Sequence, residues 1–303
     1  MDASILIQVT LWGLYAGCIY ILLAIGLNLI FGVMKVVNFA HGEFLMLAAY
    51  ITFWLNAFTG LNPYYVIPVT MLILAVVGVL VERLAFRPIR GTGKLNEIFL
   101  SLGLIYVFQN FAAFFWGTSQ RSVHSPYAEI SIPFGPTNFP LDYLIIIVTT
   151  GIFLVLFYLF MKKTDTGRAM RATSQNREAA QLMGVNVGRM DMLSFAIGSS
   201  LAAVAGSLWM ISGQMANPFM GSIPAIKAFA VVIIGGLGSI PGAVIAGLLL
   251  GLSENIIPIV LQLGASFFGY NASFNAWKDV IAFGILIVVL VIRPTGLFGG
   301  KGE

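Results

Sequence analysis

Residues 3–34, ASILIQVTLWGLYAGCIYILLAIGLNLIFGVM, form a stretch without a single Asp, Glu, Lys or Arg. A helix that crosses a bilayer needs ~20 consecutive, mainly apolar residues, so this stretch is long enough to do so. It lacks the basic start of a cleaved signal peptide, and further apolar stretches follow it closely. We therefore expect residues 3–34 to contain a retained transmembrane helix.

The composition of the whole chain agrees with this interpretation. Of its 303 residues, 59% are hydrophobic and only 9% are charged, whereas soluble domains carry roughly 25% charged residues. These values exclude a soluble globular enzyme and a disordered chain. The fold class that we predict is all-α: a polytopic transmembrane helical bundle that forms one domain over residues 1–303.

The spacing of charges and turn residues divides this bundle into nine helical segments. Segment 225–236 is too short to cross a bilayer alone at ~1.5 Å per residue, so we expect a half-helix or a re-entrant element there. The number of full spans then lies between seven and nine. The helices are expected at about 5–31, 43–59, 64–81, 97–116, 141–161, 193–213, 225–236, 243–262 and 276–292.

Lysine and arginine residues are concentrated in three polar segments. Twelve of the 16 lie in residues 82–96, in residues 162–191 or after residue 292. Basic residues are in excess in the cytoplasmic loops of membrane proteins, so we expect these segments in the cytoplasm. The amino terminus is then predicted on the outer side, together with the connections near 60–63, 117–140, 214–224 and 263–275, which carry only Arg121 between them.

Two parts of the chain show the same order of features. A break, a helix, a turn, a second helix and an Arg-Pro pair occur at 38–91 and again at 236–298. This order predicts a parallel internal repeat, which transporters use to place a pathway between two halves. The alternative is that Gly, Pro and Arg simply mark the ends of membrane helices.

Small residues recur at helical spacing in two places. Such stripes let helix backbones approach closely in lipid, where no hydrophobic force drives helices together. They predict a tightly packed bundle and carry no information about the substrate. The first stripe is Gly198, Ala202 and Gly206, and the second is Ala243, Gly247 and Gly251.

Motifs for catalysis and metal binding are missing from the sequence. The HExxH and GxSxG patterns do not occur, and Cys18 is the single cysteine. We therefore predict no catalytic residue, no metal site and no cofactor bound by this chain. The positions of the basic residues relative to the spans explain the net charge of +4, so nucleic acid is not an expected partner.

The segment GTGKL at residues 91–95 superficially resembles a phosphate-binding loop. The true motif, GxxxxGK[ST], would need glycine where Pro88 stands and serine or threonine where Leu95 stands. The chain therefore cannot bind ATP by this route, and any ATP-driven role requires another subunit.

The longest charged stretch is KKTDTGRAMRATSQNREAAQLMGVNVGRMD at residues 162–191. Residues 166–183 are good helix formers, and Gly184 is a natural helix stop. Within this stretch, the segment Glu178-Ala179-Ala180 followed by Gly184 resembles the EAAxxxG loop through which importer permeases dock onto their ATPases. The alternative is a solvated cytoplasmic connector.

Longer blocks make this resemblance specific. In order and spacing, the chain resembles the permease subunits of bacterial branched-chain amino acid ABC importers, and it is most similar to the type without a long amino-terminal extension. The blocks that carry the resemblance are GLNLIFGVMKVVNFAHGEFLMLAAY (26–50), ERLAFRPIRG (82–91), TGRAMRA (166–172) with EAAQLMGVN (178–186), FAIGSSLAAVAGSL (195–208), AIKAFAVVIIGGLGSIPGAVIAGLLLGLSENI (225–256) and KDVIAFGILIVVLVIRPTGLFG (278–299).

The resemblance implies a set of partners and a location. It implies a multi-pass subunit of the bacterial inner membrane that pairs with a second homologous permease. Two cytoplasmic ATPase subunits would hold the ATP and magnesium, and a periplasmic binding protein would deliver Leu, Ile or Val. Within the segment 162–191, the residues that the resemblance implies for ATPase coupling are Arg168, Arg171, Glu178, Ala179, Ala180 and Gly184.

Several polar residues fall within or at the edges of apolar runs. An ionisable group at membrane depth costs at least ~2.5–3.5 kcal/mol on insertion scales, so each needs a partner or water. We treat these residues as candidates for a translocation pathway: Asn28, Asn38, His41, Glu43, Lys227, Glu254 and Asn255.

Three of these candidates can also be interpreted from their positions in the helices. Glu43 can simply sit at the amino end of its helix, where the helix dipole favours a carboxylate. Lys227 can lie near an interface and extend its amine to water. Glu254 lies about midway along its helix, which favours a pathway role, a bundle-locking role or pairing with a group such as Lys227 over a lipid-facing position.

Two other classes of function remain open at this point. Related permeases carry urea, short amides or sugars, and a self-sufficient secondary transporter or channel would also be a helical bundle. Such a transporter would be expected to show charged relays in several helices, and few charges are present. The prediction is therefore a non-enzymatic permease subunit of an ATP-driven importer for branched-chain amino acids.

Overall fold

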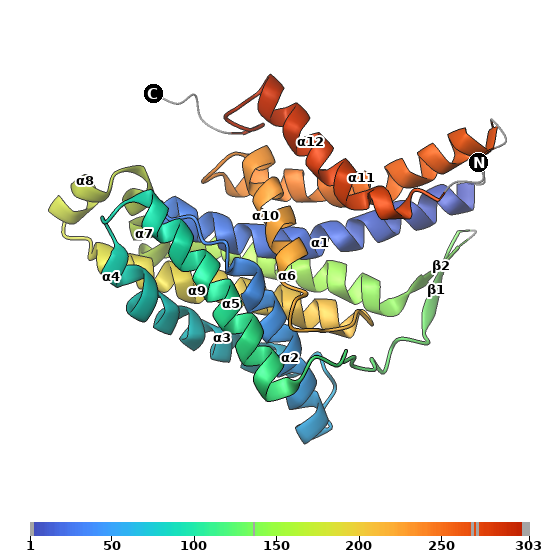
Figure 1. Ribbon diagram of the computed structural model, residues 1–303, viewed down its shortest axis with the longest axis horizontal. Coiled ribbons are helices and arrows are strands. Elements are labelled where there is room, and N and C mark those ends of the chain that lie inside the picture. The colour runs from blue at the N-terminus through green and yellow to red at the C-terminus, as the bar shows by residue number, and fades with distance from the viewer. Residues whose placement is uncertain (1–2, 136, 268–269, 271–272, 299–303) are drawn as a thin grey trace.

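The computed structural model describes residues 3–135, 137–267, 270 and 273–298. All nine expected segments are helical in it, which confirms the all-α fold class (Figure 1). The long helices are α1 (Ala3–Met34), α2 (His41–Thr59), α3 (Ile67–Val81), α5 (Lys94–Trp116), α6 (Leu141–Lys163), α9 (Val187–Ile211), α10 (Ser222–Gly235), α11 (Ile240–Phe267) and α12 (Lys278–Ile292).

Short elements connect these helices. A π-helical turn, η1 (Glu82–Phe86), and α4 (Arg87–Ile89) continue α3, and a single 3₁₀ turn, η2 (Asn275–Trp277), precedes α12. Two short helices, α7 (Asp165–Gln175) and α8 (Arg177–Leu182), lie between α6 and α9. The one sheet in the described chain is an antiparallel hairpin of β1 (Ser131–Phe134) and β2 (Thr137–Pro140), in register from Ser131 opposite Pro140.

Helix α1 is the centre of the bundle. It runs across the whole molecule, and nearly all of its residues from Tyr15 to Met34 are buried (Figure 1). Helices α9 and α11 pack closely through the predicted small-residue stripes: Gly198 meets Gly26 of α1, Gly247 meets Ile21, and Gly251 meets the backbone of Gly13 and Gly17, whereas Gly206 meets Leu45 of α2. A side chain at these positions would collide with atoms of the neighbouring helix, so the tight packing predicted from the stripes is confirmed.

Six helices among the described residues are long and apolar enough to cross a membrane by themselves. Helix α2 is nearly as long but begins with the polar residues His41 and Glu43. Helices α10 and α12 have only 14 and 15 residues, or about 21–23 Å at ~1.5 Å per residue. This length agrees with a half-helix at α10, and it makes α12 a second short element that the sequence pattern did not distinguish.

Two helix boundaries differ clearly from the expectation. Helix α11 continues past residue 262 to Phe267. Helix α9 was expected to begin near residue 193, after the last charge, but it begins at Val187. The side chain of Asn186 accepts a hydrogen bond from the backbone N–H of Arg189 at 2.9 Å and so caps the helix. The capping residue, rather than the end of the charged run, sets the start of the helix.

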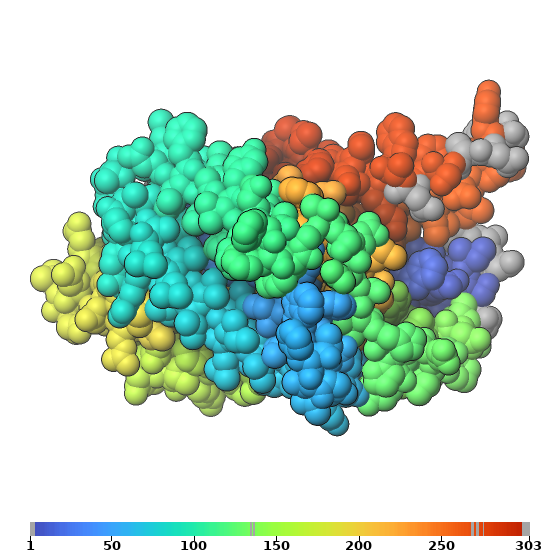
Figure 2. Space-filling model, turned by 60° about the horizontal axis from the view of Figure 1, so that its bottom comes forward, coloured from blue at the N-terminus to red at the C-terminus, as the bar shows by residue number. Residues whose placement is uncertain are grey.

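The basic segments and the segments poor in basic residues lie at opposite ends of the molecule (Figure 1). Helices α4, α7 and α8, which belong to the basic segments 82–96 and 162–191, are at one end. The amino-terminal end of α1 and the β1–β2 hairpin are at the other, as the orientation predicted from the charges requires. Between the ends, α5 covers one face and exposes Phe99, Tyr106 and Phe114 (Figure 2).

Asn28 connects α1 to the second break of the predicted repeat. Its side chain accepts a hydrogen bond from the N–H of Gly238 at 2.6 Å and donates to the carbonyl of Ser239 at 2.9 Å. The repeat itself stays a prediction.

The close approach of α1 and α11 leads to a stability prediction. In Gly251→Ala, the added methyl group would meet the backbone of Gly13 and Gly17, so we expect a loss of ~1–3 kcal/mol, typical of overpacking. Gly264→Ala, in the same helix with open space around it, should have no such effect. Thermal unfolding of the two purified variants measures the difference, and equal melting temperatures would show that α1 and α11 do not pack this closely.

Candidate functional site

Residues 166–183 form two helices rather than the single helix that the sequence suggested. Asn176 ends α7 with extended backbone, and its side chain accepts a hydrogen bond from the N–H of Ala179 at 2.9 Å to cap α8. Thr164 caps α7 in the same way, through the N–H of Gly167 at 3.0 Å. Asparagine competes well as a cap, so it breaks a run of helix formers into two.

Gly184 stops α8 as expected. It adopts the left-handed conformation, with φ of +84°, and its N–H donates to the carbonyl of Gln181 while the next N–H, of Val185, donates to Ala180. This pair of hydrogen bonds is the Schellman helix stop, for which glycine is favoured. The result is a short, stiff helix whose last residues protrude: Leu182 is 88% and Met183 85% exposed, at the end of the molecule shown in yellow in Figure 2.

The other predicted coupling residues lie around this helix with different surroundings. Glu178 and Ala179 are exposed on α8, whereas Ala180 is buried beneath it. Arg168 pairs with the exposed Asp165, and Arg171 donates to the carbonyl of Met161. The exposed residues are available to a partner, and Ala180 and Arg171 hold the two helices onto the bundle.

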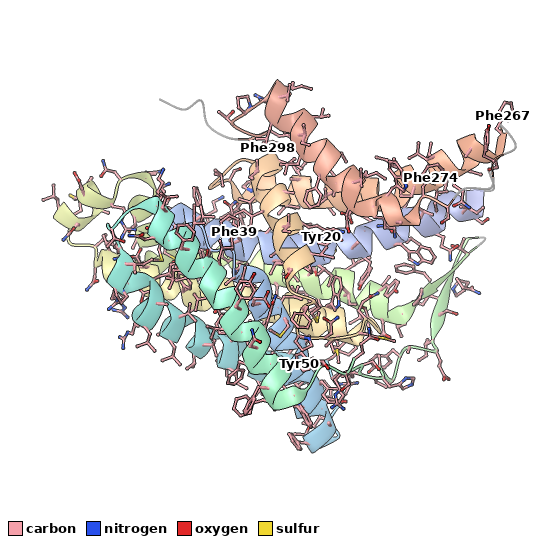
Figure 3. All side chains as sticks on the ribbon, in the orientation of Figure 1. Tyr20, Phe39, Tyr50, Phe267, Phe274 and Phe298 are labelled. Carbon is pink, nitrogen blue, oxygen red and sulfur yellow. The ribbon has the colours of Figure 1, made fainter. Side chains whose placement is uncertain are left out.

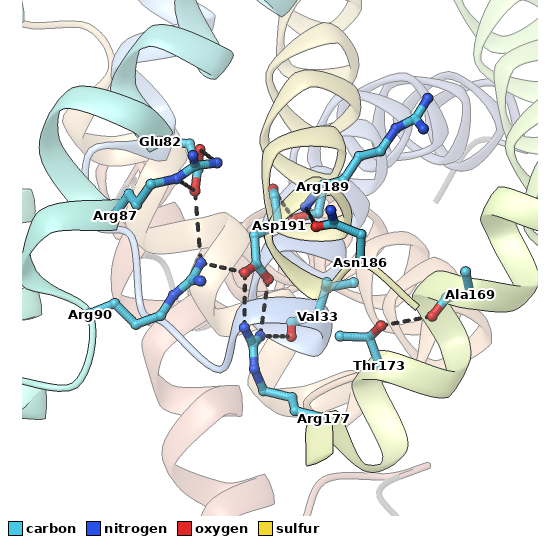
Figure 4. A network of polar contacts seen from close by, with 11 residues as sticks. Val33, Glu82, Arg87, Arg90, Ala169, Thr173, Arg177, Asn186, Arg189 and Asp191 are labelled. Carbon is cyan, nitrogen blue, oxygen red and sulfur yellow. Dashed lines mark hydrogen bonds and ion pairs between the residues drawn. The ribbon is translucent and has the colours of Figure 1, made fainter. Parts of the chain in front are cut away.

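A network of ion pairs that the sequence did not reveal fixes α8 to the bundle (Figure 4). Its centre is Asp191, a fully buried residue of α9. Arg177 of α8 makes two hydrogen bonds to this carboxylate, at 3.0 and 2.9 Å, and a third to the carbonyl of Val33 at 2.7 Å. Arg90 also pairs with Asp191. One carboxylate therefore joins both basic loops to the end of α1.

A second buried carboxylate, Glu82, strengthens the connection to residues 82–96. Arg87 donates two hydrogen bonds to it, at 3.2 and 3.1 Å, and Arg90 lies 3.7 Å away. Glu82 and Asp191 stand at the edges of the charged segments in the sequence. Their burial could not be seen there, because it depends on two distant loops meeting at one end of the bundle.

The candidate pathway residues of the first half of the chain prove to be mostly parts of helix joints. Asn28 holds the turn at residues 238–239, as described above. The side chain of Asn38 accepts from the N–H of Ala40 at 3.0 Å, at the start of α2. His41 is buried against Gly26 of α1 and Phe44. These contacts position elements, and a role of the three residues in transport stays a prediction.

Glu43 combines two of the expected features. It lies in the first turn of α2, where the helix dipole favours a negative charge. It is also buried, and it accepts a hydrogen bond from the side-chain amide of Gln109 on α5 at 2.9 Å. Gln109 donates to Ser222 of α10 as well, at 3.1 Å, so Glu43 belongs to a contact between three helices.

Lys227 and Glu254 meet inside the bundle, and two further groups join them. The amine of Lys227 lies 3.0 Å from Glu254 and 2.9 Å from Asp279. The hydroxyl of Tyr20 donates to Glu254 at 2.9 Å and accepts from Lys227 at 3.2 Å. Lys227 is buried, so it does not extend to an interface. Tyr20 lies in the middle of the bundle, where α10 crosses α1 (Figure 3).

A cavity of about 480 Å³ opens beside this cluster. Lys227, Glu254, Asn255 and Lys278 form its polar wall. Lys278 donates to the side-chain oxygen of Asn255 at 3.2 Å. Aromatic residues also line the cavity, namely Trp12, Tyr15, Tyr143 and Trp209, of which Tyr15 stacks on Tyr143 at 4.3 Å between ring centroids.

Sequence reasoning identified Lys227, Glu254 and Asn255 and named a pair between Glu254 and Lys227 as one option, but it missed Tyr20 and Asp279. Tyr20 stands in an apolar run, where a tyrosine is normally taken for packing, and Asp279 stands at the start of a helix, where an acidic residue is common. The available signal was that Glu254 and Asp279 lie on two consecutive helical segments of the sequence. It becomes informative only once α11 and α12 are known to be neighbours.

Comparison with known proteins gives consistent matches over nearly the whole chain. The family model described as branched-chain amino acid transport system / permease component matches residues 9–290. The high-affinity branched-chain amino acid transport system permease protein BraD of Pseudomonas aeruginosa is 35% identical over 95% of this chain and 94% of its own. The corresponding permease protein LivH of Salmonella typhimurium is 31% identical over 95% and 93%.

A second kind of permease from the same transport systems also matches. The permease protein LivM of Escherichia coli is 25% identical over 92% of this chain, which spans 67% of that longer protein. This chain is thus more similar to BraD and LivH than to LivM.

The Asp191 network predicts how α8 is held. Asp191→Asn removes the carboxylate shared by Arg90 and Arg177, so we expect faster hydrogen exchange in residues 176–186. Breaking a buried pair costs ~3–5 kcal/mol, and somewhat less where the arginines are partly exposed. The matched control is Asp165→Asn, which removes an exposed pair worth ~0–1 kcal/mol. Unchanged exchange in both variants would show that α8 is held by other contacts.

Proposed function

Because this chain belongs to the family of branched-chain amino acid transport system permease components, we propose that it lines the membrane path of an ATP-driven importer. Its family and its apolar helices make it a multi-pass membrane permease, a transport subunit rather than an enzyme. In the complete importer it would work with a second permease, two ATPase subunits and a binding protein outside the membrane.

The observation that carries this proposal is the form of α8. A motor protein that moves a membrane subunit needs a firm point of contact, and α8 offers exposed Leu182 and Met183 on a helix stopped by Gly184. The Arg177–Asp191 pair and the hydrogen bond from Arg177 to Val33 connect that helix to α9 and α1. Movement of α8 would therefore be passed directly to the two helices at the centre of the bundle.

The source of energy lies outside this chain. Its one glycine- and lysine-containing segment, residues 91–95, lacks the residues of a phosphate-binding loop. We assign ATP and magnesium to the partner ATPase subunits and no cofactor to the permease. The similarity to both LivH and LivM supports a heterodimer with a second, homologous permease.

The alternatives raised by the sequence receive less support. Permeases for urea, short amides or sugars and self-sufficient transporters are not favoured, because the family model and the relatives above are all described as parts of branched-chain amino acid transport systems. For the orientation we retain the charge-based assignment: the α8 end in the cytoplasm and the amino terminus in the periplasm, across the bacterial inner membrane.

Gly184 gives the first test of coupling. A β-branched residue is strained in the left-handed conformation, so Gly184→Val should distort the end of α8 and lower substrate-stimulated ATP hydrolysis and uptake together. Gly60→Val is the matched control, because Gly60 ends α2 with φ of +65° and open space around it. Both variants lose similar stability, but only Gly184→Val should uncouple.

Crosslinking tests the contact itself. Cysteines at Leu182 and Met183 should form crosslinks to the ATPase subunits in the assembled, active transporter, whereas a cysteine at the exposed Phe58, at the far end of α2, should not. If active complexes form no crosslink from residues 178–184, the ATPase docks elsewhere and this part of the proposal fails.

Single-cysteine labelling tests the orientation. In a Cys18→Ala background, a membrane-impermeant maleimide added to intact spheroplasts should label His124→Cys, in the segment 117–140, and leave Met183→Cys unlabelled until the membrane is opened. Both positions are exposed, so access to the reagent depends on the side of the membrane. The reverse pattern would overturn the assignment.

A further inference from the structure

The cavity next to Lys227 has the chemical features of a binding site, because two kinds of side chain line it. Charged and amide groups come from α10, α11, α12 and Gln214, and aromatic rings come from α1, α6 and α9. Its volume, about 480 Å³, falls within the ~300–1,000 Å³ typical of small-molecule pockets. A purely structural ion pair would need no space of this kind beside it.

Charged groups of both signs lie at the cavity. Lys227 faces two carboxylates, Glu254 and Asp279, so it can lose contact with one and stay paired with the other. Lys278 is held at the cavity only by a hydrogen bond to Asn255 among the contacts described for it. Lys227, Lys278 and Glu254 line the cavity itself, so both cations and a carboxylate are available to a ligand there.

Tyr20 connects the positive and the negative group of this arrangement. Its hydroxyl bridges Lys227 and Glu254, donating to the carboxylate and accepting from the amine. The ring of Tyr20 also lies beneath the amine, 5.4 Å from its centre, a cation–π contact that stabilises the lysine when its carboxylate contacts change. Tyr20 therefore holds both the amine of Lys227 and the carboxylate of Glu254 in place while their other contacts change.

We infer that this cavity is an intramembrane binding site for a zwitterionic amino acid with an aliphatic side chain. The carboxylate of the ligand pairs with Lys227 and Lys278, its ammonium group pairs with Glu254, and its side chain packs against Trp12, Tyr15 and Trp209. A zwitterion leaving water loses the solvation of both charges, and a site that already holds both opposite charges offsets this loss. The inference rests on the proposed function, since it supplies the stopping place for the imported substrate.

The position of the cavity fits such a stopping place. Its lining comes from the first half of α1, from Gln214 just after α9 and from the start of α12. These segments are at the end of the bundle away from α8, which is the periplasmic side in the proposed orientation. An amino acid released by a binding protein would reach this site before it passes the middle of the membrane.

The test uses the assembled transporter in lipid nanodiscs, without nucleotide and without binding protein. Binding of radiolabelled leucine is measured at equilibrium, with unlabelled leucine, leucinamide and 4-methylpentanoate as competitors. Leucinamide lacks the carboxylate and 4-methylpentanoate lacks the ammonium group. We expect saturable binding of leucine and at least ~10-fold weaker competition by each analogue, because each loses charge-assisted hydrogen bonds.

Variants test the residues. Lys227→Met combined with Glu254→Gln removes one charge of each sign, which keeps the site neutral, and should weaken leucine binding at least ~10-fold. Lys94→Met combined with Glu129→Gln removes the same charges from exposed positions outside the site and should leave binding unchanged. The competition series on the unaltered protein needs no variant, so misfolding of the paired variant would not decide the outcome.

The results separate this inference from the proposed function. If the transporter imports leucine but shows no saturable binding, or if leucinamide competes as well as leucine, the site is wrong and the importer stands. If the transporter imports no branched-chain amino acid while leucine still binds and leucinamide does not, the importer assignment is wrong and the zwitterion site stands.

Discussion

The close packing of α1 against α9 and α11 is the constraint on which the rest of the structure depends. Glycines at the contacts bring main chains together, and α1 is consequently buried along most of its length. From that central position it supplies Tyr20 to the charged cluster, Asn28 to the turn before α11 and the carbonyl of Val33 to Arg177. One helix therefore connects the α8 end of the bundle with the cavity in its other half.

Buried charges explain the remaining organisation. A charged side chain inside an apolar bundle needs partners. In this chain, charged side chains form one cluster at the α8 end and another around the cavity. At the α8 end, Asp191 and Glu82 bind the arginines of both basic loops and make that end rigid. Beside the cavity, the single positive charge of Lys227 is paired with two carboxylates, Glu254 and Asp279. The first arrangement suits the transmission of movement, and the second suits a site whose contacts must change.

The sequence predicted the features that depend on local pattern. Apolar stretches between charges placed all nine helices, the small-residue stripes predicted the contacts of α1, and Gly184 predicted the end of α8. It could not predict the features that depend on distant segments meeting. Asp191 and Tyr20 acquire their roles only when other helices bring Arg90 and Lys227 to them, and the break at Asn176 required a cap to prevail over good helix formers.

The central claim is that the cavity beside Lys227 and the contact surface at α8 belong to one transport path joined by α1. A cryo-electron microscopy structure of the assembled, nucleotide-free transporter soaked with leucine tests it most directly. We expect density for the amino acid between Lys227 and Glu254, with α8 seated on an ATPase subunit. An ATPase bound elsewhere, or leucine seen only away from this cavity while the Lys227–Glu254 pair is unchanged, would contradict it.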